Sequence, residues 1–328
     1  MYKKYMIEIL DKQTKFLLKR TPLKLSFADF LAYVNIQYPS LGNIYKYQAI
    51  PEGYEDANFL IYTFKGKYVL KIFSNERSKQ NIKDYVRILK EAKETGVQTM
   101  ALIKGRKSPL GKIANTYFII TKYFQGRNFQ DKQPTLIEIR DITKEIAKLN
   151  TIKFGVEESY DSWGNANLLK EYNLNKGRLD QETINYLTPT INKLKMLKTG
   201  NFSKNLIHGD MQRLHVLKNA AGKFCIIDYG CARNDLKVYE LSTFLAWFCL
   251  TKKQWRNRKN IWNTVVKSYT KIHNLKKSES ASLLMLTEAA YAAYYFKTYL
   301  LRKQGDRSWQ TRSWYKQAKT MLDLIRNW

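Results

Sequence analysis

The stretch that decides the fold is "NLIHGDMQRLHVLKNAAGKFCIIDYG", residues 205–230. It contains two short apolar runs, at 206–207 and 225–227, and a carboxylate follows each of them: Asp210 after the first and Asp228 after the second. Two hairpin-turn aspartates would not explain why an apolar strand leads into each acid. The pattern instead predicts a site that holds a metal ion and a reacting hydroxyl, the two parts that phosphoryl transfer requires.

The composition is that of a folded protein with one large or two modest domains. The chain has 328 residues, of which 44% are hydrophobic and 14% aromatic. Apolar runs of about 18 uncharged residues are absent, which argues against a membrane-spanning helix. The basic N-terminus lacks a continuous apolar region, so we expect a cytoplasmic protein. Three cysteines without a CxxC pair argue against a disulfide framework or a zinc knuckle.

The chain is strongly basic, with 57 Lys and Arg against 28 Asp and Glu and a net charge of +29. Such a field attracts polyanions, including nucleic acid, anionic surfaces and phosphorylated substrates, although compositional bias also explains it. Near the C-terminus, "TKKQWRNRKN" and "DRSWQTRSWYKQ" alternate cations with Trp. This pattern suits stacking on bases, but it is more often a solvated helix face with Trp anchors in the core. Both interpretations remain open.

The order of expected elements predicts two lobes of the α+β class. A helix that Ser26 opens is followed by strand patterns at 43–50, 58–64 and 67–73, a helix at 81–94, strands at 99–105 and 115–124, and then mostly helices. We therefore expect an N-terminal lobe at 1–124, which includes a helical extension at 1–43, and a C-terminal lobe at 125–328. A ligand cleft between two such lobes is the natural expectation.

Lys71 interrupts the apolar strand "YVLKIF". Strand alternation places Tyr68 and Leu70 on one face and Lys71 with Phe73 on the other, so the lysine points toward the expected cleft. Its role there would be to hold nucleotide phosphates, and Asp84 on the following helix is a candidate ion-pair partner. A solvent-exposed lysine on an edge strand is the simpler alternative.

These motifs, with "VYELSTFL" downstream, resemble the aminoglycoside phosphotransferase/choline kinase superfamily, whose fold is similar to that of protein kinases. The pattern His-x-Asp-x-x-x-x-Asn falls on His208, Asp210 and His215, and Asp-x-Gly falls on Asp228 and Gly230. The resemblance implies a two-lobed protein-kinase-like fold, with an antiparallel nucleotide-binding sheet in the N-lobe at 1–124. The C-lobe at 125–328 would carry the catalytic loop and the acceptor-binding helices. It also implies ATP and Mg²⁺ as cofactors and a small-molecule hydroxyl as the phosphate acceptor.

The same resemblance assigns roles to individual residues. Asp210 would be the catalytic base, Asp228 the Mg²⁺ ligand, and Lys71 the lysine on the α- and β-phosphates, with Asp84 in place of the family's helix Glu. Glu240 would brace the catalytic loop.

The segment "FIITKYFQG" matches the family's strand and hinge. Thr121 would therefore lie near the adenine pocket. The backbone of Lys122, Tyr123 and Phe124 would bind the base.

One departure from the family concerns the metal. His215 stands where the family has a metal-binding Asn. A neutral imidazole ligates metals, but Mg²⁺ prefers oxygen and Mn²⁺ tolerates nitrogen better. His215 therefore either coordinates a second ion, with a leaning toward Mn²⁺, or only packs and hydrogen-bonds. The corresponding alternative function is a catalytically impaired pseudokinase that binds a nucleotide or a polyanion.

Two further patterns argue for other sites, and we set both aside. "GRKSPLGK" has five residues between its glycines and Ile113 where a phosphate-binding loop needs Ser or Thr, so a β-turn explains it better. A transition-metal site built from His208, His215 and the two aspartates is disfavoured because His208 is expected to pack inward.

The sequence therefore predicts an ATP-dependent phosphotransferase acting on a small-molecule hydroxyl. Because the acceptor lobe is basic, neutral or anionic acceptors are favoured over cationic antibiotics.

Overall fold

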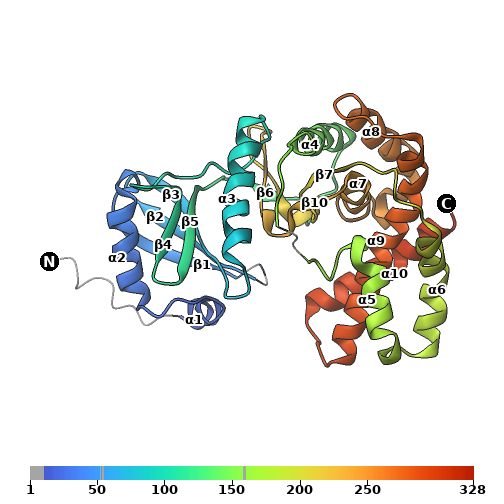
Figure 1. Cartoon of the computed structure of the whole chain (residues 1–328), viewed down its shortest axis with the longest axis horizontal. Coiled ribbons are helices and arrows are strands. Elements are labelled where there is room, and N and C mark those ends of the chain that lie inside the picture. Colours follow the sequence, from blue (N-terminus) through green and yellow to red (C-terminus); the bar gives the residue numbers. More distant parts are fainter. Residues whose placement is uncertain (1–10, 52, 54, 158–159) are drawn as a thin grey trace. The chain divides into compact units, whose positions relative to one another are not determined.

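The structure is a computed structural model that describes residues 11–51, 53, 55–157 and 160–328. The chain divides into two compact units (Figure 1). The first comprises residues 1–94 and 98–125, and the second comprises residues 95–97 and 126–328. Each unit is described by itself.

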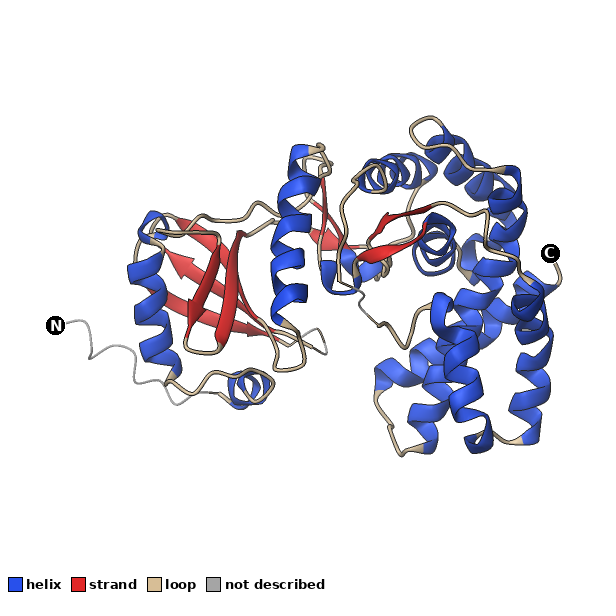
Figure 2. Cartoon of the chain, viewed as in Figure 1, coloured by secondary structure: helices blue, strands red, loops and turns tan. Residues whose placement is uncertain are grey.

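The first unit is built on a five-stranded antiparallel sheet in the order β1-β2-β3-β5-β4 (Figure 2). The strands are β1 (Ile44–Ile50), β2 (Ala57–Thr63), β3 (Gly66–Ile72), β4 (Leu110–Ile113) and β5 (Thr116–Lys122), and the helices are α1 (Lys12–Leu18), α2 (Phe27–Gln37) and α3 (Lys79–Glu94).

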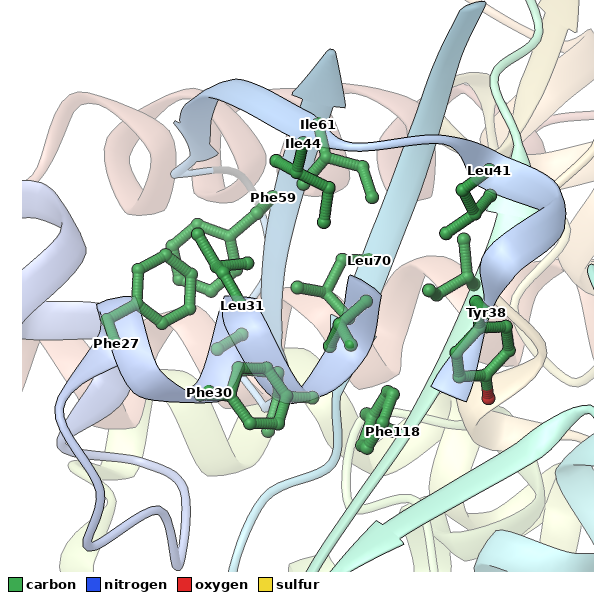
Figure 3. Packing of buried hydrophobic residues seen from close by; sticks show 14 of the residues in the cluster. Phe27, Phe30, Leu31, Tyr38, Leu41, Ile44, Phe59, Ile61, Leu70 and Phe118 are labelled. Carbon is green, nitrogen blue, oxygen red and sulfur yellow. The ribbon is translucent and has the colours of Figure 1, made fainter. Parts of the chain in front are cut away.

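Helix α2 covers one face of this sheet. Ser26 caps its N-terminus by accepting the N–H of Asp29, as the sequence predicts. The helix buries aromatic and aliphatic side chains against the strands, and each such side chain contributes about 1.5–3 kcal/mol. Figure 3 shows this core, which includes Phe27, Phe30, Leu31, Phe59, Leu70 and Phe118.

The opposite face of β3 meets α3. Leu70 belongs to the α2 core, whereas Phe73 contacts Tyr85 of α3 with ring centroids 5.4 Å apart. The Nζ atom of Lys71 lies 5.5 Å from the same Tyr85 ring. The predicted alternation along this strand is therefore confirmed, and Lys71 is a buried residue.

The strand predicted at 99–105 is wrong. That segment makes only a single isolated bridge to β5, and the edge strand is β4, formed from the predicted turn "KSPLGK". Two hydrogen bonds join the segment to β5, from the Ile103 N–H to the Ile120 carbonyl and from the Lys122 N–H to the Ala101 carbonyl, before the turn between Gly105 and Ser108 ends the pairing. In β4, a Cβ on Gly111 would lie 2.3 Å from the ring of Phe118, so glycine lets that ring cover the edge strand. Strand β4 occupies the end of "GRKSPLGK", where a phosphate-binding loop would require a helix, so the exclusion of that loop holds.

The second unit is mostly helical and contains two small sheets, β7–β10 and β6-β8-β9. Its strands are β6 (Arg127–Asn128), β7 (Lys204–Ile207), β8 (Val216–Lys218), β9 (Phe224–Ile226) and β10 (Arg233–Leu236). Its helices are α4 (Leu136–Leu149), α5 (Leu168–Asn175), α6 (Gln181–Met196), α7 (Lys237–Phe244), α8 (Arg258–Thr270), α9 (Lys277–Lys303) and α10 (Trp309–Arg326).

Helix α9 forms the core of this unit and packs against α6, α7 and α10. Its alanine-rich middle is buried, as expected for a core helix. Trp328 at the C-terminus lies 5.7 Å from Trp255 and 5.1 Å from Trp262 between ring centroids, so these tryptophans anchor the segment to the unit. Across the described residues, none of the helices is long and apolar enough to cross a membrane.

Candidate active site

Asp210 and Asp228 each follow the end of a strand. β7 ends at Ile207, three residues before Asp210, and β9 ends two residues before Asp228. Between β7 and Asp210 the chain turns at Gly209, where φ is +82° and a Cβ would lie 2.4 Å from the carbonyl oxygen of Cys231. Only glycine fits this position, so the turn between β7 and Asp210 depends on Gly209.

His208 locks the two loops together. Its Nε2 lies 2.9 Å from the carbonyl oxygen of Ile227, and its Nδ1 accepts the N–H of Asp210 at 3.3 Å. Burial lowers the pKa of this imidazole to about 4, so it is neutral near pH 7. Both ring nitrogens are engaged by backbone, which excludes His208 as a ligand in the transition-metal alternative.

Glu240 holds the same loop from α7. Its Oε2 accepts the N–H of Gly209 at 2.8 Å, the bracing contact expected from the resemblance. The side chain is completely buried, and this burial raises the pKa of the carboxyl to about 7, against the lowering effects of the Gly209 N–H and of Arg233. The loop is therefore fixed by an acid that has few cationic partners.

Gln212 orients the carboxylate of Asp210. Its Nε2 donates to both oxygens of Asp210, at 2.9 Å each. The Asp210 side chain is 22% exposed, so it is held in place yet open to a ligand. Sequence reasoning missed Gln212, although its position two residues after Asp210 was the available signal.

His215 lies between the two aspartates. Its Nδ1 is 2.8 Å from the main-chain oxygen of Asp210 and must donate there, because a carbonyl only accepts. In the neutral ring the lone pair is then on Nε2, which is 3.9 Å from Oδ2 of Asp228. Two electron-pair donors face one another across this gap, an arrangement that suits a shared cation.

Asp228 adopts the left-handed conformation, with φ of +64°, and its side chain is 40% exposed. Strained backbone of this kind often marks functional positions. Within the described ranges, groups of three or more His, Cys, Asp or Glu residues that could hold a metal are absent. Asp228 and His215 would together offer one oxygen and one nitrogen ligand to a divalent ion, and Mg²⁺ usually takes further ligands from phosphates and water.

A further acid, Asp161, lies next to this site. Its pKa is raised to about 6, first by burial and then by the charge of Asp210. The N–H of Trp163 donates to its Oδ1 at 2.8 Å. Sequence reasoning missed Asp161, because nothing in its neighbourhood along the chain connects it to Asp210.

Trp163, which binds this acid through its backbone N–H, belongs to an aromatic cluster. Tyr294 of α9 is buried. Burial is the main cause that raises the pKa of its hydroxyl, and the negative charges of Asp210 and Asp161 raise it further. Its ring lies 4.0 Å from Trp247, 5.1 Å from Trp163 and 5.9 Å from Trp314 between centroids. Trp163 and Trp314 also meet each other at 5.4 Å.

The first unit holds Lys71 in an ion-pair network. Its Nζ lies 3.0 Å from Oδ2 of Asp56, whose Oδ1 accepts Nε of Arg77 at 2.8 Å. Sequence reasoning missed Asp56. The predicted partner Asp84 is buried on α3 and accepts Nε2 of Gln80 at 2.9 Å, and its pairing with Lys71 stays a prediction.

The predicted hinge residues lie at the end of β5 and directly after it. Thr121 pairs with Val69 and so lies on the Lys71 face of the sheet, where its hydroxyl approaches the sulfur of Met100 at 3.8 Å. The N–H groups of Lys122 and Tyr123 donate to the carbonyls of Ala101 and Lys67. In the described part of the chain this leaves the N–H of Phe124 as the predicted donor without a backbone acceptor.

Comparisons with known proteins identify the family of the chain. The model of the phosphotransferase enzyme family matches residues 46–264. The chain belongs to this family. It is a small-molecule kinase with an alcohol group as acceptor, and its fold is the two-lobed kinase-like fold that the sequence predicts.

Among curated relatives, homoserine kinase of Bradyrhizobium diazoefficiens is 23% identical over 270 residues, covering 80% of each chain. Homoserine kinase of Bartonella henselae is 23% identical over 258 residues, covering 76% of this chain and 79% of that protein.

Among solved structures, a spectinomycin phosphotransferase in complex with ADP and its antibiotic has a TM-score of 0.65 at 14% identity, covering 93% of this chain and 98% of that one. Choline kinase from Streptococcus pneumoniae has a TM-score of 0.58 at 11% identity, covering 92% of this chain and 100% of that one. These likenesses show the fold.

Proposed function

We propose that this kinase transfers the γ-phosphate of ATP to the hydroxyl of a small amino acid, an amino alcohol that also carries a carboxylate. Homoserine, the substrate named by the curated relatives, is such a compound. It carries no net charge, in keeping with the expectation of a neutral or anionic acceptor. The observations that carry the proposal are the electrostatic interaction of Asp161 with Asp210 and the hydrogen bond that joins Asp161 to Trp163 of the aromatic cluster.

The cluster suits a single ammonium group. Asp161 provides one carboxylate, and Trp163, whose backbone N–H donates to that carboxylate, provides a half-buried ring that attracts a cation. A polycationic antibiotic would need several carboxylates, whereas this cluster adds one acid to the catalytic Asp210. The ammonium of an amino acid therefore matches the available charge.

Lys297 is the candidate partner for the acceptor's carboxylate. It lies three residues after Tyr294 on α9, so both side chains occupy one face of that helix. Its Nζ donates to the hydroxyl of Ser162 at 2.8 Å, next to Asp161 in the chain, and is 3.9 Å from Glu171. The ammonium of Lys297 is thus close to the residue that would hold the acceptor's own ammonium.

In the proposed reaction, Asp210 accepts the proton of the acceptor hydroxyl. The oxygen forms a bond to the γ-phosphorus, and the bond between that phosphorus and the bridging oxygen of ADP breaks. Asp228 and His215 would hold a divalent ion, Mg²⁺ or Mn²⁺, which neutralises phosphate charge. Lys71 would contact the α- and β-phosphates, and Phe124 would contact the adenine.

The test is ADP release with L-homoserine, ethanolamine, choline and glucose as acceptors, each with Mg²⁺ and with Mn²⁺. We expect turnover to be fastest with homoserine. Asp210→Asn should lower kcat about 10³-fold, while nucleotide binding measured by calorimetry stays within about twofold, because a general base acts in the chemical step. Absence of turnover with every acceptor and metal would instead support the pseudokinase alternative, which His215 motivates.

Two variants separate the acceptor groups. Lys297→Met should raise the KM for homoserine about tenfold and leave the KM for ethanolamine unchanged, because ethanolamine has no carboxylate. Asp161→Asn should raise both KM values. Since Asp161 is charged only above its pKa of about 6, the wild-type KM should rise as pH falls through 6, and this rise should vanish in Asp161→Asn. Equal effects of Lys297→Met on the two acceptors would contradict the amino-acid assignment.

A further inference from the structure

A concave pocket lies in the second unit between the C-terminal end of α9 and one face of α10. Its volume is about 400 Å³, within the range of small-molecule sites. The lining residues are mainly cationic: Arg302, Arg312, Tyr315, Lys316, Lys319, Thr320 and Asp323. None of them belongs to the catalytic loops or to the acceptor cluster described above.

The cations converge because of helical spacing. Arg312, Lys316 and Lys319 are separated by four and three residues on α10, which places them on one face of the helix. Arg302 reaches the same pocket from the last turn of α9. Four cations therefore share this space with a single carboxylate, Asp323.

The charges in the pocket are not balanced by neighbouring acids. Asp323 already accepts the hydroxyl of Tyr186 at 2.6 Å. Among the described residues, the four cations make no ion pair with a carboxylate at 4.0 Å or less. By contrast, Arg326 on the same helix pairs with Glu288 at 3.3 Å. Gathering like charges without counterions is unfavourable, and a bound anion would relieve this repulsion.

The pocket offers charge rather than an open aromatic surface. Tyr315 is its only aromatic lining residue. The guanidinium of Arg302 lies 4.1 Å from the centre of this ring, and Tyr295 stacks with it at 5.0 Å. A nucleobase would need a free ring to stack on, whereas a phosphate group needs cations and N–H donors.

The acceptor cluster uses other side chains of the same helices. Trp314, next to Tyr315, meets Trp163 and Tyr294, while Tyr315 meets Tyr295. Neighbouring residues on α9 and α10 thus face either the aromatic cluster or the cationic pocket. The pocket shares no lining residue with the cluster.

We propose that this pocket binds a small anion with more than one phosphate charge, such as pyrophosphate or a doubly phosphorylated metabolite. Two arginines provide planar forks that match phosphate oxygens, and two lysines add mobile positive charge. The proposal does not depend on the identity of the phosphate acceptor.

Calorimetry with inorganic pyrophosphate in metal-free buffer tests it. The pocket variant is Arg312→Gln with Lys316→Gln, and the matched control is Lys252→Gln with Lys253→Gln, which removes the same charge from exposed lysines elsewhere in the second unit. We expect the pocket variant to weaken binding at least about tenfold and the control to change it less than about twofold. All four positions are exposed, and equal Tm values will show that the variants fold.

Three results would overturn the proposal. The first is absence of pyrophosphate binding to the wild-type protein at millimolar concentration. The second is equal weakening by the pocket and control variants, which would show attraction by net charge alone. The third is binding that Lys71→Ala abolishes, which would place the anion at the proposed nucleotide site. A single-stranded oligonucleotide serves as a parallel probe, and its binding together with the first result would show that the basic surface attracts long polyanions instead of a small anion.

Discussion

Two buried carboxylates, one in each unit, illustrate different ways of keeping an acid inside a protein. The side chain of Asp56 is 1% exposed and lies against two cations, Lys71 at 3.0 Å and Arg77 at 2.8 Å. Glu240 is completely buried, and its Oε2 accepts the N–H of Gly209. Its Oε1 has no hydrogen-bond partner among the residues that the structure describes.

The difference corresponds to what each acid fixes. Asp56 holds side-chain cations, and a buried acid paired with cations keeps its charge at moderate cost. Glu240 holds a backbone loop through neutral N–H donors, which do not fully offset the cost of burying a charge, and its pKa is raised to about 7. Asp56 therefore positions two charged side chains, whereas Glu240 positions the backbone of a loop.

The largest expected effect comes from removing Lys71, one of the two cations that pair with Asp56. If Lys71 contacts the phosphates of ATP as proposed, Lys71→Ala should lower kcat/KM for ATP about 10³-fold, because charge stabilisation at the transferring phosphate is lost. Steady-state kinetics at varied ATP concentration measures this. Arg77→Met is the matched control, since it also removes one cation from Asp56.

The two variants should separate stability from function. Both remove a partner of a buried carboxylate, so both should lower Tm. Only Lys71→Ala should lower kcat/KM by more than about tenfold. If Arg77→Met reduces activity as strongly, Lys71 acts through the ion-pair network, and its assignment to the phosphates is wrong.

Local sequence patterns were sufficient to predict several elements of this structure. Apolar runs ending in Asp210 and Asp228 gave strands at the right places, and strand alternation gave the facing of Lys71. These features depend on neighbours within a few residues. The Ser26 cap is predictable for the same reason, because it needs only the N–H of a residue three positions on.

Contacts between distant segments were not predictable from these patterns. Asp56 binds Lys71, which lies fifteen residues later in the chain. This contact depends on the register in which β2 pairs with β3, and the sequence pattern does not reveal that register. Asp161 approaches Asp210 only through the packing of the second unit. The misplaced strand at 99–105 had good propensity, but only two backbone hydrogen bonds among the described residues join that segment to β5, and residues 110–113 pair with the remainder of β5.

The second prediction concerns Glu240 and the pH dependence of stability. Its folded pKa of about 7 exceeds the usual 4.5, so its contribution to folding is fully present below pH 4.5 and is lost as pH rises through 7. The shift corresponds to about 3 kcal/mol. His208 has the opposite sign: its folded pKa of about 4 lies below 6.5, so stability is lost as pH falls from 6.5.

The two effects oppose each other between pH 4.5 and 6.5, and Glu240→Gln should remove one of them. The free energy of unfolding of the variant, relative to wild type, should rise by up to about 3 kcal/mol from pH 4.5 to pH 7.5. Urea denaturation at several pH values measures this difference. A difference independent of pH would mean that Glu240 ionises normally, and the contrast with Asp56 would then fail.

The smallest expected effect concerns His215, which lies on the loop that Glu240 braces. Replacing it with the family's residue, His215→Asn, supplies a hard oxygen in place of the imidazole nitrogen that faces Asp228. The ratio of activity with Mn²⁺ to activity with Mg²⁺ should fall about tenfold, because Mg²⁺ prefers oxygen ligands. His273→Asn is the control, since that histidine contacts Asn150 and Asn205 instead. An unchanged ratio in His215→Asn would mean that His215 only positions Asp210 through its Nδ1, and the metal would then depend on Asp228 alone.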